Sequence, residues 1–438
     1  MIVDTLIHAR WIIPVEPANV TYDHHSLVIN EGRIIDLLPT ADAKQKYQGI
    51  STEYLSQHAL LPGFVNCHTH AAMSLMRGIA DDLPLMDWLQ NHIWPLEQQW
   101  MSEEFVKDGT DLAIAEMILS GTTCFNDMYY FPEIAAQQAI QHGMRANLGM
   151  VVIDFPTVYA QNSDEYITKG LALHEQVQGE PLISVAFAPH APYTVSDAPL
   201  QKIKQHADEL GLLVNMHVHE TLHEVDQAYK DTGKRPLQRL QELGLVNASF
   251  VAVHMTQLND AEIDMMAAAN AHIVHCPESN LKLASGFCPV ARCLAAGINV
   301  ALGTDGAASN NDLDMLGEMR TAALLAKAVT NNASAVPAMA ALQMATLNGA
   351  KALGLDKDIG SLLIGKAADV IAIDLDCLST QPVYDPISQI VYAVNRQQVT
   401  DVWVNGKRLL KKRQLTTIDI IGLKATVAQW QARLAHKN

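Results

Sequence analysis

Short apolar runs recur through the middle of the chain, and a stretch with helical periodicity follows each of them. The runs are LLPGFVNCHTH (60–70), GTTCFND (121–127), RANLGMVVI (145–153), ISVAFAPHA (183–191), LLVNMHVHE (212–220), SFVAVHM (249–255), AHIVHCP (271–277) and NVALGTD (299–305). Continuous apolar strands that alternate with helices indicate a parallel sheet buried on both faces. Eight such units that close on themselves predict an α/β fold of the (β/α)8 barrel type, with its active site at the carboxyl ends of the strands.

The two ends of the chain have a different pattern. Residues 1–57 alternate apolar and polar side chains around a turn in NEGRIID (30–36), and residues 360–415 do so around an Asn-Gly turn. We therefore predict three parts. They are a small β-sandwich domain formed by 1–57 plus 360–415, a (β/α)8 barrel domain over 58–359, and a C-terminal surface helix over 416–438.

Charge and cysteine content narrow the class of protein. The 438 residues carry 47 acidic and 30 basic side chains, whereas phosphate binding needs clustered Lys and Arg. A nucleic-acid or anionic-membrane partner is therefore not expected. The six cysteines form no CxxC pair, which indicates reduced thiols in a cytoplasmic protein. The first residues, MIVDTLIHARWIIPVEP, break their apolar runs with polar side chains and predict neither a signal peptide nor a membrane span.

Histidine, Asp and Glu side chains gather where the predicted barrel strands end. The first strand ends in His68 and His70, and both imidazoles face one side because residues i and i+2 of a strand do so. The fifth strand ends in HVHE (217–220), the sixth in His254 and the eighth in Asp305. Three neutral imidazoles and one carboxylate, with room for a water, suit a catalytic zinc ion.

Each of these pieces also has an explanation without chemistry. An HxH pair arises by chance, a strand-ending Asp can cap the next helix, and His254 alone can be a hydrogen-bonded core residue. Their shared location favours the metal site, because all four groups fall where a barrel enzyme needs them.

Several segments resemble one known family of barrel enzymes. Similarity to the mononuclear branch of the amidohydrolase superfamily is carried by PGFVNCHTH (62–70), HVHET (217–221), VAVHM (251–255) and GTDGAASNN (303–311). Similarity to the 5′-methylthioadenosine/S-adenosylhomocysteine deaminase family, and to the related triazine hydrolases, is carried by DDLPLMDWLQNHIWPLE (81–97) and APHAPYTVS (188–196). The resemblance covers nearly the whole chain, including IGSLLIGKAADVIAID (359–374).

The resemblance implies a set of metal ligands, which are His68, His70, His217 and Asp305. His217 is chosen over His219 because the family pattern is HxxE, with Glu220 three residues on. Strict alternation would place Glu220 on the face opposite His217 unless the strand end twists. The fourth strand ends in APHAP, without the Lys that bridges two metals, so we expect one divalent ion per chain. The ligand set suits Zn2+ best and also Fe2+.

The resemblance also implies hydrolytic deamination at C6 of an adenine ring, which releases ammonia. Asp305 would accept the proton of a metal-activated water, and His254 would steer that water. Glu220 would protonate the ring nitrogen beside the attacked carbon.

Four further residues are expected to contact substrate. By resemblance, Glu97 would accept hydrogen bonds from the ribose hydroxyls and His190 would face the nucleoside. Trp88 would supply an apolar wall, although packing within a helix explains it equally well. Ser309 is the last candidate, with helix N-capping as its alternative. The histidines interpreted as structural or surface residues are His219, His223, His272 and His275.

The stretch after the third strand predicts the substrate preference. Family members that act well on S-adenosylhomocysteine clamp its carboxylate there with arginines, whereas residues 152–170 offer only Lys169 among three acids. A methylthio group would suit the neighbouring Phe155, Val158 and Tyr159 better. We expect 5′-methylthioadenosine to be preferred, adenosine to be tolerated and S-adenosylhomocysteine to be poorer, unless another loop or subunit supplies a cation.

Two alternatives stay open at this point. An s-triazine hydrolase, or a guanine or cytosine deaminase, needs the same ligands, and Glu97 with His190 favours a nucleoside over these substrates. A non-catalytic scaffold on this fold would have lost metal ligands, whereas this chain keeps the full set. A homo-oligomer is expected, because such barrels commonly associate.

Overall fold

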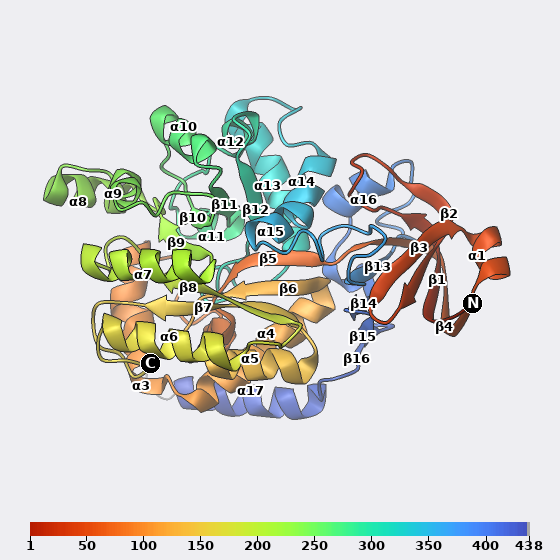
Figure 1. Cartoon of the computed structure of the whole chain (residues 1–438), viewed down its shortest axis with the longest axis horizontal. Coiled ribbons are helices and arrows are strands. Elements are labelled where there is room, and N and C mark those ends of the chain that lie inside the picture. The colour runs from red at the N-terminus through yellow and green to blue at the C-terminus, as the bar shows by residue number, and fades with distance from the viewer. Residues whose placement is uncertain (436–438) are drawn as a thin grey trace.

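The structure, a computed structural model, describes residues 1–435. Within this range the strands form two sheets of eight strands each. The first sheet, with its helices, fills the left of Figure 1, and the second sheet, built from both ends of the chain, lies at the right. Along residues 1–435, no helix combines the length and the apolar character needed to cross a lipid bilayer.

The first sheet is a parallel barrel whose strands follow one another in chain order. Its strands are β5 (Phe64–Thr69), β6 (Thr122–Asp127), β7 (Arg145–Val152), β8 (Ile183–Pro189), β9 (Val214–Val218), β10 (Phe250–His254), β11 (His272–His275) and β12 (Asn299–Leu302). Each strand lies inside one of the apolar runs of the sequence, and almost every strand residue is buried. The predicted (β/α)8 barrel is therefore confirmed.

Helices separate the barrel strands and cover the outside of the sheet (Figure 1). They are α4 (Glu103–Ser120), α5 (Pro132–His142), α6 (Ser163–Gln176), α7 (Asp197–Leu210), α8 (Leu222–Thr232), α9 (Pro236–Glu242), α10 (Asp260–Ala268), α11 (Pro277–Lys282), α12 (Val290–Ala295), α13 (Met315–Thr330), α14 (Ala338–Met344) and α15 (Leu347–Ala352). Local signals start some of these helices. For example, α10 begins with a capping box between Asn259 and Glu262.

The barrel closes at its mouth, where the segment after β12 meets β5. The N–H of Asp305 donates to the carbonyl of His68 over 2.9 Å. Gly303 permits this approach, because a Cβ at that position would lie 2.8 Å from the backbone nitrogen of His68. The closure places His68 and Asp305 side by side.

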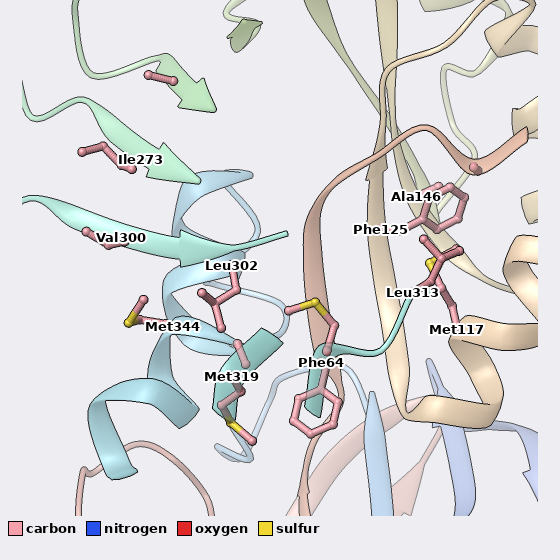
Figure 2. Close-up of a cluster of buried hydrophobic side chains, with 14 of the residues drawn as sticks. Phe64, Met117, Phe125, Ala146, Ile273, Val300, Leu302, Leu313, Met319 and Met344 are labelled. Atoms are coloured by element: carbon pink, nitrogen blue, oxygen red, sulfur yellow. The ribbon is translucent and has the colours of Figure 1, made fainter. Parts of the chain in front are cut away.

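Apolar side chains fill the layer between the strands and the helices. Figure 2 shows members of this layer, including the fully buried Phe64, Phe125, Leu302, Met319 and Met344. Burial of one such side chain stabilises the fold by about 1.5–3 kcal/mol. This apolar layer lies outside the mouth of the barrel. It stabilises the strands, and the polar side chains at the strand ends are therefore not needed for the stability of the core.

The second sheet joins the two ends of the chain in the order β16-β15-β14-β13-β4-β1-β2-β3. Its strands are β1 (Ile2–Ile12), β2 (Tyr22–Asn30), β3 (Arg33–Pro39), β4 (Gln48–Pro62), β13 (Val370–Asp374), β14 (Val399–Val404), β15 (Lys407–Lys411) and β16 (Gln414–Leu415). Pairing of β4 with β13, from Pro62↔Val370 to His58↔Asp374, unites the ends. The strand β4 continues to Pro62, beyond residue 57, where the sequence predicts the first part of the β domain to end. The residue limits of the three parts remain predictions.

A buried ion pair connects the barrel with the second sheet. Arg145, the first residue of β7, donates to both carboxylate oxygens of Asp369 over 2.8 and 3.1 Å. The same carboxylate accepts the N–H of Asn405 over 2.7 Å. Both charged side chains are buried, so Arg145 does not reach the mouth of the barrel.

Two further segments cover the barrel. The mouth is covered by the segment after β5, which contains η1 (Ala71–Met76), α2 (Leu85–Asp87), the π-helix η2 (Trp88–Ile93) and α3 (Trp94–Trp100). The helix α17 (Ile420–Ala435) packs against α4, where Nε1 of Trp430 donates to Asp108 over 2.8 Å. It falls in the predicted C-terminal helix, of which residues 436–438 lie outside the described residues. The helix α16 (Pro386–Tyr392) lies between β13 and β14 in the chain and packs against α13 and α14.

Candidate active site

Three histidines and one aspartate converge at the mouth of the barrel. Oδ1 of Asp305 lies 3.1 Å from Nε2 of His70 and 3.4 Å from Nε2 of His68. Nε2 of His217 lies 3.1 Å from Nε2 of His68. The structure thus brings together the four residues that the sequence suggested as metal ligands.

The proton positions of these histidines fit a bound cation. Nδ1–H of His217 donates to the carbonyl of His190 over 2.7 Å, and Nδ1–H of His70 donates to the carbonyl of Met128 over 2.6 Å. A neutral imidazole that carries its proton on Nδ1 presents a lone pair at Nε2. Nε2 of His68 lies 3.1 Å from Nε2 of His217, and among the described residues the buried Nδ1 of His68 has no hydrogen-bond partner. Ring nitrogens so close together, beside a carboxylate oxygen, are the arrangement that ligands of one metal ion need. The donor set therefore fits a divalent ion.

Two serine hydroxyls hold the second oxygen of Asp305. Ser279 donates to Oδ2 over 2.6 Å and Ser309 donates to it over 2.9 Å, which leaves Oδ1 directed at the histidines. Ser309, suggested from the sequence as a substrate contact, also lines the cavity described below. Ser279 was not predicted, because it lies just after β11 in the segment PESN and no spacing marks it.

The turn after β9 directs Glu220 into the mouth. His219 adopts a φ of 52°, a left-handed conformation that is rare for residues other than glycine, and this breaks the alternation of the strand. As a result Glu220 lines the same cavity as His217, although strict alternation would separate them. The ring of His219 points elsewhere and is buried, with Nε2 accepting the N–H of Leu237 over 3.2 Å.

Glu220 and His254 lie close together in the mouth. Oε2 of Glu220 is 3.7 Å from Nε2 of His254. Nδ1–H of His254 donates to Oδ1 of Asn280 over 2.9 Å, so Nε2 is the acceptor atom that faces the cavity. Burial raises the pKa of Glu220, which favours its protonated form. Asn280 is a second residue that the sequence did not mark.

A cavity opens above the histidines, and its empty volume, including the part open to solvent, is about 770 Å³. Its polar lining includes Glu97, His190, Glu220, His254 and Ser309. Its apolar lining includes Leu85, Trp88, Leu89, Ile93, Val151 and Phe155. Among the described residues, no Lys or Arg lines it. All four residues suggested as substrate contacts therefore face one cavity together with the catalytic candidates.

Glu97, on α3, is half-buried, and it lines this cavity. The hydroxyl of Tyr129 donates to its Oε1 over 2.7 Å. Burial raises the pKa of Glu97 to about 7, because the bond from Tyr129 offsets only part of the desolvation. Tyr129 follows β6 and was not predicted, since only the fold brings it to α3.

The two remaining candidates, Trp88 and His190, lie at the cavity wall, where Trp88 is buried and His190 is half-buried. Trp88 lies in the π-helix η2 and is 6 % exposed, so it packs within the covering segment and lines the cavity at once. The ring of His190 lies 4.9 Å from the ring of His217, measured between centroids. Burial lowers the pKa of His190 to about 3, so its imidazole is neutral near pH 7.

These features define a class of protein. A parallel barrel in which imidazoles and a carboxylate converge at the carboxyl ends of the strands, beside a buried carboxylic acid, is typical of metal-dependent hydrolytic enzymes. A family model described as "Amidohydrolase family" matches residues 59–409. The chain belongs to the amidohydrolase family, which confirms the resemblance seen in the sequence.

Individual relatives are similar along nearly the whole chain. A 5-methylthioadenosine/S-adenosylhomocysteine deaminase of Teredinibacter turnerae is 51 % identical over 435 residues, covering 99 % of this chain and 98 % of that protein. The structure of an adenosine deaminase from Xanthomonas campestris with bound zinc is 51 % identical, with a TM-score of 0.98 and 99 % of each chain covered. A zinc complex of atrazine chlorohydrolase from Arthrobacter aurescens has a TM-score of 0.91 at 22 % identity, covering 97 % of this chain and 99 % of that one. This last likeness shows the fold alone.

Proposed function

We propose that this chain is a hydrolytic deaminase of adenine nucleosides, which converts 5′-methylthioadenosine to its inosine analogue and ammonia. Adenosine is a further substrate, and S-adenosylhomocysteine is a poorer one. The observation that carries the proposal is the position of Glu97 and Glu220, two carboxyl groups with raised pKa values that line one cavity with the metal-ligand candidates. Glu97 suits hydrogen bonds from the two ribose hydroxyls, and Glu220 suits proton transfer to a ring nitrogen. The names of the relatives from T. turnerae and X. campestris support this assignment.

One divalent ion per chain would be held by His68, His70, His217 and Asp305. We propose zinc, supported by the zinc in the related X. campestris structure, although the same donors suit Fe2+. When bound, such an ion supplies a water activated as a nucleophile at neutral pH.

The proton transfers are assigned to three side chains. Asp305 accepts the proton of the attacking water, since its carboxylate is held in one orientation by Ser279 and Ser309. Glu220 protonates the ring nitrogen beside C6, and its raised pKa favours the protonated form that a proton donor needs. His254 orients the water through Nε2, because Nδ1 is engaged by Asn280.

The nucleoside is bound by residues at the wall of the cavity. Glu97 accepts hydrogen bonds from the ribose hydroxyls, and Tyr129 keeps its carboxyl in place. His190 faces the nucleoside as a neutral imidazole, while Trp88 forms an apolar wall and Ser309 lies near the attacked carbon.

A second cavity continues beyond Glu97 and accounts for the proposed preference. It shares Trp94, Glu97, Tyr130 and Phe155 with the first cavity and extends to Gln98, Thr157, Val158 and Gln161. Among the residues described, it contains no Lys or Arg. Phe155 and Val158 offer contacts to a methylthio group, whereas Tyr159 is absent from this lining and its hydroxyl donates to Glu133 over 3.2 Å.

The cations nearest to this loop in the sequence are already paired. Nζ of Lys169 donates to the carbonyl of Tyr159 and lies 3.0 Å from Glu165. Arg145, the first residue of β7, is bound to Asp369 at the end of the barrel opposite the mouth. Among the residues described, a carboxylate attached to the 5′ sulfur would therefore find no Lys or Arg in the lining of either cavity, which disfavours S-adenosylhomocysteine.

The proposal extends to the setting of the enzyme. With a formal charge of −17, the chain is proposed to be a cytoplasmic homo-oligomer whose partner is a small nucleoside, not a nucleic acid or a membrane. Light scattering after gel filtration tests the oligomer, and cell fractionation tests the location.

Ammonia release from a panel of compounds tests the proposed reaction. We expect the highest kcat/KM for 5′-methylthioadenosine, then adenosine, then S-adenosylhomocysteine, with guanine, cytosine and melamine inactive. Glu97→Gln serves as a matched variant, because it should impair the nucleosides through the ribose contact while leaving bound metal unchanged. Highest activity on a free base or a triazine would overturn the assignment.

A further inference from the structure

The carboxyl group of Glu224 spans the turn that carries Glu220. Its Oε1 accepts the N–H of His219 over 3.0 Å, and its Oε2 accepts the N–H of Glu220 over 2.8 Å. Glu224 lies in the first turn of α8 and is buried. Two adjacent N–H groups that point at one side chain need an acceptor with two oxygens, and a carboxyl group is that acceptor.

The carbonyls of the same turn are held from the opposite side. The N–H of Thr256 donates to the carbonyl of His219 over 3.0 Å, and its hydroxyl donates to the carbonyl of Glu220 over 2.7 Å. A left-handed residue such as His219 persists only where surrounding contacts over-determine its conformation. The two backbone units that set the direction of Glu220 are thus bonded on both sides.

Helix capping alone does not explain the bonds of Glu224. In the capping box of α10, the side chain of Glu262 returns to the N–H of the N-cap residue Asn259. Glu224 holds the equivalent position in α8, three residues after the N-cap Thr221. Its carboxyl group, however, accepts the N–H groups of the two residues that precede this cap. The cap itself is made by Thr221, whose hydroxyl accepts the N–H of Glu224 over 3.2 Å.

We propose that Glu224 is a positioning residue for catalysis, which holds the His219–Glu220 turn in the conformation that aims the Glu220 carboxyl into the cavity. The inference rests on the proposed role of Glu220 as proton donor. Glu224 does not line the substrate cavity but borders a neighbouring one, which shares Leu85 and Tyr193 with it. Because both carboxyl oxygens of Glu224 are bonded to the His219–Glu220 turn, we assign its effect on catalysis to the position of Glu220.

A double-mutant cycle tests this positioning role. Glu224→Gln keeps the size of the side chain but sets an NH2 group against one N–H of the turn. We expect kcat to fall by about 100-fold, because small misplacements of a reacting group have effects of this size, with KM and bound metal unchanged. In a Glu220→Gln background, the same substitution should change kcat by less than about twofold, because coupled residues are not additive.

Two further variants complete the experiment. Thr221→Ala removes the cap but leaves both carboxyl bonds, so any small effect on kcat should be equal in the two backgrounds. Thr256→Val loosens the turn from its other side and takes the place of Glu224→Gln if that variant has a lowered melting temperature and loses metal. Its effect should likewise vanish in the Glu220→Gln background.

The outcomes separate this inference from the proposed function. Equal losses from Glu224→Gln in both backgrounds, or normal turnover of Glu224→Gln beside an inactive Glu220→Gln, would overturn the positioning role alone. Normal turnover of Glu220→Gln itself would overturn the proton-donor assignment on which the inference rests.

Discussion

The hydroxyl of Ser279 donates to Oδ2 of Asp305 over 2.6 Å, and this bond fixes which oxygen of the carboxylate faces His68 and His70. Groups that orient metal ligands commonly contribute about 10- to 100-fold to metal affinity. We therefore expect Ser279→Ala to weaken metal binding by this amount, measured by competition with a chelator. Ser285→Ala is the matched control, because within the described part of the chain the buried Ser285 hydroxyl has no hydrogen-bond partner. Equal losses in both variants would contradict the role of Ser279.

Metal analysis of the purified protein should give about one divalent ion per chain, and a chelator should remove it together with activity. His68→Ala and His217→Ala should remain folded by circular dichroism yet lack metal and activity, since these side chains belong to the mouth and not to the apolar layer around the barrel. Two ions per chain bridged by a modified lysine would rule out the single-ion site.

Glu220→Gln should retain its metal and lose deaminase turnover by about 10²- to 10⁴-fold, because an amide cannot pass a proton to the ring nitrogen. Single-turnover kinetics with metal content measured on the same sample provide the check. Near-normal turnover would reduce Glu220 to a structural residue.

The pKa of Glu97, raised by burial from 4.5 to about 7, predicts an acid limb in the pH profile. Below this pKa the carboxyl is protonated and loses acceptor capacity for ribose, so kcat/KM for nucleosides should fall as pH drops through about 7. The hydrogen bond from Tyr129 lowers this pKa, so Tyr129→Phe should move the limb to higher pH. A limb that stays in place in Tyr129→Phe would assign it to another group.

Comparison of kcat/KM for the two thioether nucleosides tests the selectivity. Loss of one charge-assisted pair costs about 1.5–3 kcal/mol, so 5′-methylthioadenosine should exceed S-adenosylhomocysteine by roughly 10- to 100-fold. Val158→Arg, at a half-exposed position in the second cavity, should narrow this ratio, while the neutral Val158→Gln should not. Equal values in the unmodified enzyme would mean that a carboxylate finds a partner elsewhere.

The sequence predicts most of the barrel because its strands are buried on both faces and therefore carry continuous apolar runs. β7, for instance, is buried along its whole length and is recognised in RANLGMVVI. The HxH pair is also predictable, since alternation places His68 and His70 on one side of β5.

The same rule fails at the end of β9. Strict alternation places Glu220 and His217 on opposite faces of the strand, and the left-handed φ of His219 brings them to the same cavity. The sequence does not predict this conformation, because histidine rarely adopts it. Tyr129 and Ser279 were missed for another reason. Each contributes a single hydroxyl to a partner far away in the sequence, Glu97 and Asp305, and such pairs appear only once the chain has folded.

The pairing of β4 with β13 has a consequence for how this protein is made. Pro62 lies before the first barrel strand and pairs with Val370, which follows the last, while Arg145 needs Asp369 to neutralise its buried charge. During synthesis, the ribosome delivers the partner of β4 only after every barrel strand has emerged. Until then, the edge of β4 that pairs with β13 has no partner. Because contacts between residues far apart in the sequence form slowly, we expect the pairing of β4 with β13 to be a late step that completes folding.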